Sequence, residues 1–107
     1  MKDDSLLIKD MLESGIKATE YLGNQNYEKF SNDTLLQDAI ARRLEILGEA
    51  ASQISKEFQK SHSEFDWKGI IGLRNRLIHG YDYVDVEVIW KILKEDLPDL
   101  ISKIKSM

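Results

Sequence analysis

The stretch NDTLLQDAIARRLEILGEAASQISKEF, residues 32–58, decides the fold, because it carries the longest helical pattern in the chain. Its apolar residues recur at every third or fourth position, as they do on one face of an α-helix. These residues are Leu36, Ile40, Leu44, Leu47, Ala51, Ile54 and Phe58. A second apolar stripe beside them consists of Leu35, Ala39, Ile46 and Ala50. We therefore expect a long helix, capped by Asn32 or Asp33, that contacts several neighbours in a bundle and leaves room for a subunit interface.

A first helix is predicted before this stretch. It begins at a cap within residues 3–5, and its apolar face extends to Leu22. Its apolar or small positions are Ile8, Met11, Leu12, Gly15, Thr19 and Leu22. The segment 23–33 is rich in turn-forming residues and is predicted to be a connection that contains one helical turn.

Two helices are predicted after the long one. The third helix covers residues 67–78, and Gly80 is suited to the left-handed conformation that often follows a helix. The last helix covers residues 86–104, and Pro98 should kink it or split off its final turn. The expected caps of these two helices are Asp66 and Asp85.

These patterns predict an all-α protein, an antiparallel up-down four-helix bundle with room for an extra short helix. A chain of 107 residues is expected to form a single domain over residues 1–107. The alternating pattern of strands is missing, and no apolar run approaches the roughly 20 residues that cross a bilayer. The N-terminus, MKDDSLLIKD, is acidic where a secretory signal is basic and apolar. We therefore expect a cytoplasmic protein without membrane contact.

The composition bears on the kinds of site that the chain can form. It has no cysteine, which excludes disulfides, thiolate nucleophiles and zinc sites with sulfur ligands. It has only two histidines, too few for a histidine-rich metal site within one chain. We therefore expect no metal and no other cofactor. A magnesium site built from some of the 19 acidic residues stays open as the weaker alternative to a solvated acidic surface.

The net charge of −4 argues against broad electrostatic capture of nucleic acid. The distribution of charge is more informative than the sum. Residues 67–81 contain no acid and carry +3 from Lys68, Arg74 and Arg76, so the rest of the chain carries −4 − 3 = −7. A local positive region of this kind suits a partner that presents one or a few phosphates.

The stretch RNRLIHGY, residues 74–81, concentrates the groups that can perform chemistry. Arg74 offers a planar fork for phosphate oxygens, and His79 can exchange a proton near neutral pH. Asn75 can hold a hydroxyl or a phosphate oxygen. These groups suit the attack of an RNA 2′-hydroxyl on its adjacent phosphate without a metal. Since that reaction profits from both an acid and a base, a twofold dimer that joins two such sites would supply a second histidine.

Each of these residues also has a plainer interpretation. The helical periodicity places Arg74 at a buried position, where it would need a carboxylate partner such as Glu45 or Glu49. His79 could simply cap a helix C-terminus, and it converges with Arg74 only if the helix ends near residue 78. Arg42 and Arg43 are as consistent with salt-bridged surface residues as with an RNA-binding rim.

The same residues resemble a known family. Arg74 to His79 match the R-x4-6-H signature of HEPN domains, and with Tyr81 they match R-x4-H-x-Y, the form typical of HepT-like (DUF86) toxins. The segments 42–55, 66–81 and 84–100 are similar to family segments in the same order. One departure is Asp66, where the family pattern has proline before the tryptophan.

The resemblance implies an all-α, HEPN-like bundle that forms a homodimer, or a higher oligomer, with a composite cleft between two copies of the motif. It implies a metal-independent endoribonuclease toxin that acts on RNA and is paired with an MntA-like nucleotidyltransferase antitoxin. By this resemblance Arg74 and His79 are catalytic, Asn75 assists, and Tyr81 is the residue to which the antitoxin transfers AMP. Arg76 and Lys68 are candidates for RNA binding. The alternatives are a catalytically inactive HEPN module that binds a nucleotidyltransferase or a nucleotide, and a purely structural helical dimer.

Overall fold

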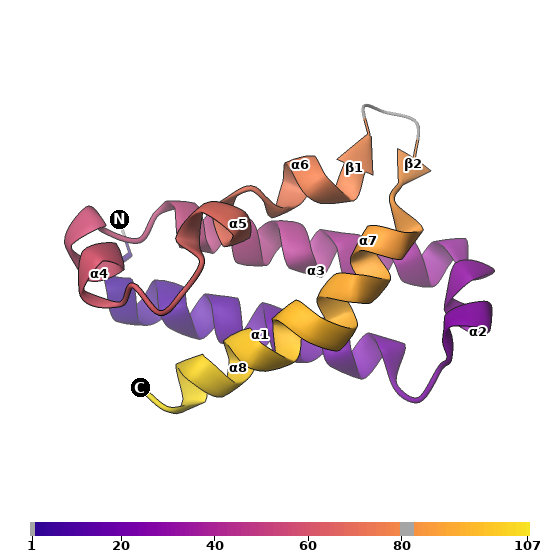
Figure 1. The fold of residues 1–107 in the computed structure, drawn as a ribbon, viewed down its shortest axis with the longest axis horizontal. Helices are drawn as coiled ribbons and strands as arrows, with labels where there is room; N and C mark the ends of the chain where they lie inside the picture. The colour runs from indigo at the N-terminus through magenta and orange to yellow at the C-terminus, as the bar shows by residue number, and fades with distance from the viewer. Residues whose placement is uncertain (1, 80–82) are drawn as a thin grey trace.

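The computed structural model describes residues 2–79 and 83–107, with only the backbone of His79, and it is predominantly helical, as predicted. Helices α1 (Asp4–Leu22) and α3 (Thr34–Ser52) lie side by side along the length of the molecule (Figure 1). The other elements, in chain order, are α2 (Tyr27–Ser31), α4 (Lys56–Ser61), α5 (Trp67–Ile71), α6 (Leu73–Leu77), β1 (Ile78–His79), β2 (Tyr83–Val84), α7 (Val86–Lys91), the π-helical segment η1 (Ile92–Asp96) and α8 (Leu97–Lys105).

Side-chain caps fix where most of these helices begin. The predicted caps Asp66 and Asp85 are confirmed, and of the alternatives for the first two long helices the caps are Asp3 and Asp33. Each of these carboxylates accepts a hydrogen bond from a backbone N–H in the first turn. The Leu6 N–H and the Ser5 hydroxyl donate to the Asp3 carboxylate and lower its pKa. The predicted helical turn within residues 23–33 is also confirmed and is helix α2.

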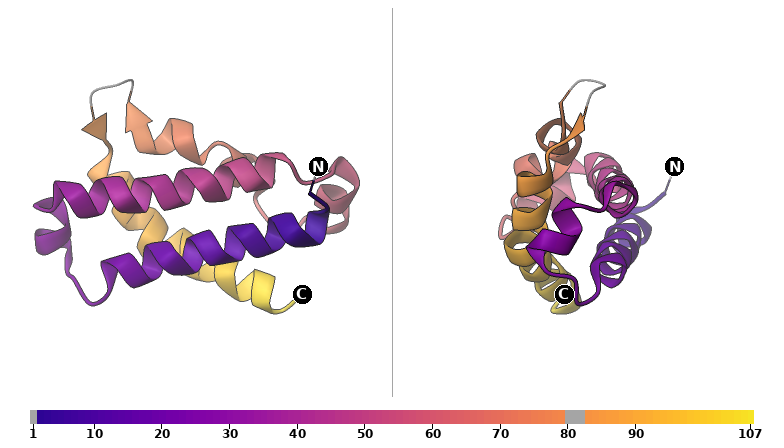
Figure 2. Two further views of the ribbon diagram at one scale, coloured as in Figure 1. Left: turned by 180° about the vertical axis from the view of Figure 1, so that it is seen from behind. Right: turned by 90° about the vertical axis from the view of Figure 1, so that its right-hand side faces the viewer.

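The core lies where α1 and α3 meet the helical run from α7 to α8. This run crosses the α1–α3 pair diagonally (Figure 2). Among the most deeply buried side chains are Met11 of α1, Leu44 and Leu47 of α3, Ile89 of α7 and Leu97 of α8. The apolar stripe of the longest predicted helix therefore faces the core as expected through Ala51. The second stripe is exposed only at its start, where Leu35 is 82% exposed, while Ala39 and Ile46 are partly buried and Ala50 belongs to the core.

The longest predicted helix ends earlier than its periodicity suggests. Helix α3 stops at Ser52, and α4 begins only after Ser55. The Asp4 carboxylate accepts hydrogen bonds from the N–H and hydroxyl of Ser55, at 2.9 and 2.6 Å, and the Ser55 hydroxyl caps α4. Because Ser55 is held by the start of α1, the chain turns here, and the predicted continuation to Phe58 is wrong.

The third predicted helix, 67–78, is also divided. It breaks at Gly72 into α5 and α6, and Gly72 has φ −83° and ψ 7°, outside the regular helical range. Glycine has little preference for a helix interior, and the chain changes direction at Gly72 between two short helices.

A short pair of strands, which the sequence did not indicate, follows α6. Ile78 pairs with Val84 and His79 with Tyr83, in antiparallel register, and the Asp85 N–H donates to the Leu77 carbonyl at 2.7 Å. The ladder lies at the edge of the molecule, between the end of α6 and the start of α7 (Figure 1). The predicted role of Gly80 after the helix lies outside the described residues.

The predicted disturbance at Pro98 takes the form of a π-helical segment. The Leu97 N–H donates to the Ile92 carbonyl, five residues earlier, and Pro98 then lies in the first turn of α8, where its missing N–H is tolerated. The helical run continues through this point. Among the described residues, none of the helices is both long and apolar enough to cross a membrane.

Candidate active-site groove

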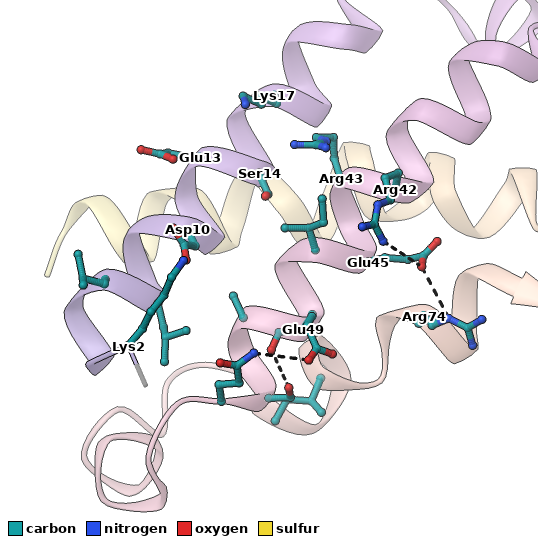
Figure 3. Close-up of a pocket in the computed structure, with 18 of the residues that line it drawn as sticks. Lys2, Asp10, Glu13, Ser14, Lys17, Arg42, Arg43, Glu45, Glu49 and Arg74 are labelled. Atoms are coloured by element: carbon teal, nitrogen blue, oxygen red, sulfur yellow. Dashed lines mark hydrogen bonds and ion pairs between the residues drawn. The ribbon is translucent and has the colours of Figure 1, made fainter.

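An open groove of about 1220 Å³ runs along α1 and α3 and reaches the α5–α6 segment. Most of the residues that line it are polar or charged (Figure 3). The charged side chains in it are Lys2, Asp10, Glu13, Lys17, Arg42, Arg43, Glu45, Glu49 and Arg74. Two of the predicted site residues, Arg74 and Asn75, lie at its α6 wall. The structure therefore brings the first two motif residues into one concave surface.

Arg74 is held at this wall by a carboxylate from α3. Its Nε lies 3.6 Å from Oε2 of Glu45, and the same oxygen lies 4.0 Å from Nη1 of Arg42 (Figure 3). The plainer interpretation predicted a carboxylate partner for Arg74, and of its two candidates Glu45 is the one that pairs with Arg74. The predicted burial of Arg74 is wrong, since its side chain is 67% exposed while that of Glu45 is 22% exposed. Because the helix breaks at Gly72, the buried positions of α6 are Leu73 and Leu77, and Arg74 faces the groove.

The position of Asn75 follows from the same break. Its backbone N–H donates to the Gly72 carbonyl, and its side chain is exposed on the groove side of α6. For His79 the structure gives the backbone, which lies in β1 opposite Tyr83. The His79 side chain and the whole of Tyr81 lie outside the described residues, so the expected convergence of Arg74 and His79 stays a prediction.

The two candidate RNA-binding residues lie away from this groove. Arg76 points to the other side of α6, where its Nη2 lies 3.4 Å from Oδ2 of Asp96. It lines a second groove, of about 490 Å³, between α3, α5 and the η1–α8 segment. Lys68 is exposed on α5 and lines neither groove. The positive region seen in the sequence is thus divided over several faces of the molecule.

Several residues outside the RNRLIHGY motif also line the groove. Lys17 and Ser14 of α1 line it, together with Arg42 and Arg43 of α3. A signal for the α1 residues exists in the sequence, since Asp10, Glu13 and Lys17 are spaced three and four apart on one helix face. Their meeting with α3 depends on how two helices pack, and a local pattern does not give this.

Within the described residues, no group of three or more histidine, aspartate or glutamate side chains is arranged so that it could hold a metal ion.

Comparison with known proteins identifies the family to which the chain is similar. The model of the family described as "Ribonuclease HepT-like" matches residues 11–107. A protein of Methanocaldococcus jannaschii that is named as a candidate RNase is 36% identical, over 97% of this chain and 95% of that protein. A protein of Thermococcus cleftensis named "Probable ribonuclease HepT" is 39% identical, over 92% of this chain and 94% of that protein. No solved structure gives a significant match.

Proposed function

The chain belongs to the HepT-like ribonuclease family, and from this membership we propose that it is a metal-independent endoribonuclease, the toxin of a HepT/MntA-type toxin–antitoxin pair. The observation that carries the proposal is the joint presence of Arg74 and Asn75 in one open groove, at the start of the motif that ends in His79. An exposed guanidinium in an open groove suits a phosphate ligand.

The proposed reaction is a transesterification within the RNA chain. The 2′-oxygen attacks the adjacent phosphorus, the bond from phosphorus to the 5′-oxygen breaks, and a 2′,3′-cyclic phosphate remains. The proton of the 2′-hydroxyl goes to a base, and an acid gives a proton to the departing 5′-oxygen. His79 carries out these proton transfers, Arg74 stabilises the extra negative charge on the phosphate, and Asn75 orients an oxygen of the substrate.

We further propose that the working unit is a homodimer of HEPN-like four-helix bundles, in which the α5–α6 segment takes the place of the third helix. The reaction requires an acid and a base, and each chain has one histidine in the motif. A twofold axis beside the groove would bring the two motifs of a dimer into one cleft. The open groove beside Arg74 is consistent with a site that is completed by a second copy.

Regulation by AMP transfer to Tyr81 is the last part of the proposal. The Tyr81 phenol oxygen attacks the α-phosphorus of ATP on the nucleotidyltransferase antitoxin, pyrophosphate leaves, and a phosphodiester forms. Tyr81 is two residues from His79, so the added anion would be tethered close to where substrate phosphate binds. Arg74 would then bind the attached phosphate in place of RNA.

The test of the cleavage proposal uses the purified protein and RNA in EDTA. Wild type should yield products that end in a 2′,3′-cyclic phosphate or its opened form, and Arg74→Ala and His79→Ala should lose at least 100-fold in rate, on the order expected for loss of a catalytic group. Arg76→Ala removes a guanidinium from the same helix outside the groove and should keep its activity. Equal cleavage by all four proteins would mean a contaminating nuclease and would end the assignment.

The test of the regulatory proposal is co-expression with a nucleotidyltransferase antitoxin of the MntA type. Intact-mass spectra should show one or more added AMP units on the wild type and none on Tyr81→Phe. An adduct that persists in Tyr81→Phe would exclude this tyrosine as the acceptor.

A further inference from the structure

Arg43 differs from the other three arginines of the chain, all of which lie within the described residues. Arg42 and Arg74 share the carboxylate of Glu45, and Arg76 pairs with Asp96. Arg43 forms no ion pair and no hydrogen bond of its side chain with any described residue, although its side chain is half-buried in the groove. A partly desolvated guanidinium favours an anionic partner, so this site is suited to an anion from outside the described residues.

The sequence explains why its own helix gives Arg43 no partner. The positions three and four residues away, which are its neighbours on the helix surface, hold Ala39, Ile40, Ile46 and Leu47. None of these is a carboxylate. The Arg43 side chain instead points across the groove toward α1, to the side where Ser14 and Lys17 lie (Figure 3).

The groove is also polarised along its length. Because α1 and α3 run antiparallel, Lys17 of α1 and Arg42 and Arg43 of α3 line the same end of the groove, and we call these three residues the cationic end. Arg43 points toward the Lys17 side, whereas Arg42 points toward Glu45. Toward the start of α1 the groove is lined by Asp10, Glu13 and Glu49, the acidic end, where Lys2 is already paired with Asp10 at 2.6 Å. A chain of phosphates is therefore attracted to the cationic end and repelled from the acidic end.

We propose that Arg43, supported by Lys17, binds a backbone phosphate of single-stranded RNA in the same groove as Arg74, on the α1 side. This inference rests on the proposed function and adds a substrate-binding subsite to it. Arg43 is suited to the role because no carboxylate has to be displaced, whereas Arg42 shares Glu45 with Arg74. The guanidinium can hold two phosphate oxygens at once, while the Lys17 ammonium adds charge at the same place.

The experiment measures binding separately from cleavage. A fluorescent single-stranded RNA oligonucleotide is titrated with the full-length His79→Ala protein over a range of salt concentrations, with and without Arg43→Gln. Loss of one phosphate contact should weaken binding. It should also make the plot of log association constant against log salt concentration less steep, by about 0.7 in slope. Lys105→Gln, which removes one positive charge at an exposed position outside both grooves, should leave the slope unchanged. An unchanged slope in Arg43→Gln, or an equal change in both variants, overturns the inference.

A second copy of the chain is the competing partner for Arg43, and the same samples test it. If Arg43→Gln converts a dimer to a monomer by mass measurement and the slope per bound chain stays the same, the anion comes from a partner subunit and the inference is wrong. In the protein that keeps His79, Arg43→Gln should raise the KM of RNA cleavage several-fold and change kcat little. If wild type does not cleave RNA in EDTA and Arg43→Gln still reduces the salt slope, the proposed nuclease function fails while the subsite stands.

Discussion

At the scale of single residues, Glu45 is the group that determines where Arg74 points. The pair is open to water on the Arg74 side, and such surface ion pairs contribute only about 0–1 kcal/mol to the stability of a protein. The contact therefore matters more for direction than for stability. A guanidinium that is fixed at the groove wall before substrate arrives loses less conformational freedom when it binds a phosphate.

We predict that Glu45→Gln lowers the kcat of RNA cleavage by about tenfold, because Arg74 loses its fixed position, while its unfolding midpoint in urea changes little. KM should stay the same or fall, since one negative charge leaves the groove. Glu49→Gln is the matched control: it lies one turn further along α3 in the same groove, and its carboxylate contacts Gln53 rather than an arginine. If both variants behave alike, a general charge effect explains the result and the positioning role is refuted.

Sequence reasoning was reliable at this scale where the cause is local. A helix cap needs only a carboxylate followed by free N–H groups, so Asp66 and Asp85 could be identified directly, and Asp3 and Asp33 could be narrowed to two or three neighbouring residues. The exposure of Arg74 could not be identified in this way, because it depends on where the predicted helix breaks before Arg74. The sequence correctly indicated that Arg74 pairs with a carboxylate of α3. The reason for expecting the pair was burial of Arg74, and this was wrong because the side chain is exposed.

At the scale of elements, the close approach of α3 and α5 positions the motif wall. A Cβ atom at Gly48 would lie 2.9 Å from the backbone carbonyl oxygen of Ile70, a distance that real Cβ atoms do not tolerate. Since a backbone oxygen cannot swing aside as a side chain can, any larger residue at position 48 must push α5 away from α3. The α6 segment that follows α5 carries Arg74 and Asn75, so such a shift also moves the wall of the groove.

We predict that Gly48→Ala destabilises the protein by about 1–2 kcal/mol in urea unfolding, because the cost of overpacking exceeds the gain in helix propensity of about 1 kcal/mol. Gly15→Ala is the matched control within α1. Its Cβ would lie 3.1 Å from a methyl carbon of Leu97, a side-chain atom that can rotate away, so we expect a change close to zero. A loss in Gly15→Ala as large as in Gly48→Ala would contradict this account.

The elements also show where periodicity stops being informative. A stripe of apolar residues continues through Ile54 and Phe58, yet the chain turns at residues 53–55, because the carboxylate of Asp4, 51 residues away, binds Ser55. Gly72 interrupts a second regular pattern without any change in its apolar spacing. The strands β1 and β2 are two residues each, too short for an alternating pattern to reveal. Apolar periodicity reports the side that faces the core and not the length of the helix.

At the scale of the whole molecule, the dimer proposal makes a quantitative prediction about mixed subunits. We expect a heterodimer of wild type and His79→Ala, purified through a different tag on each subunit, to cleave RNA almost as slowly as the His79→Ala homodimer, because one histidine cannot serve as both acid and base at the same moment. If each chain held a complete site, the heterodimer would keep about half of the wild-type rate. A heterodimer with Arg76→Ala in place of His79→Ala should remain fully active and controls for the effect of the tags.

If RNA binds as proposed, the opposite charges at the two ends of the groove would also limit the length of RNA that the protein can use. A strand that lies across Arg74 and Arg43 meets repulsion as soon as it turns toward Asp10 and Glu49, and it must leave the surface there. The footprint is then only a few nucleotides, so a loop or a short single-stranded end should be cut about as efficiently as a long transcript. Selection among cellular RNAs would then depend on which short segments are exposed, rather than on an extended stretch of sequence.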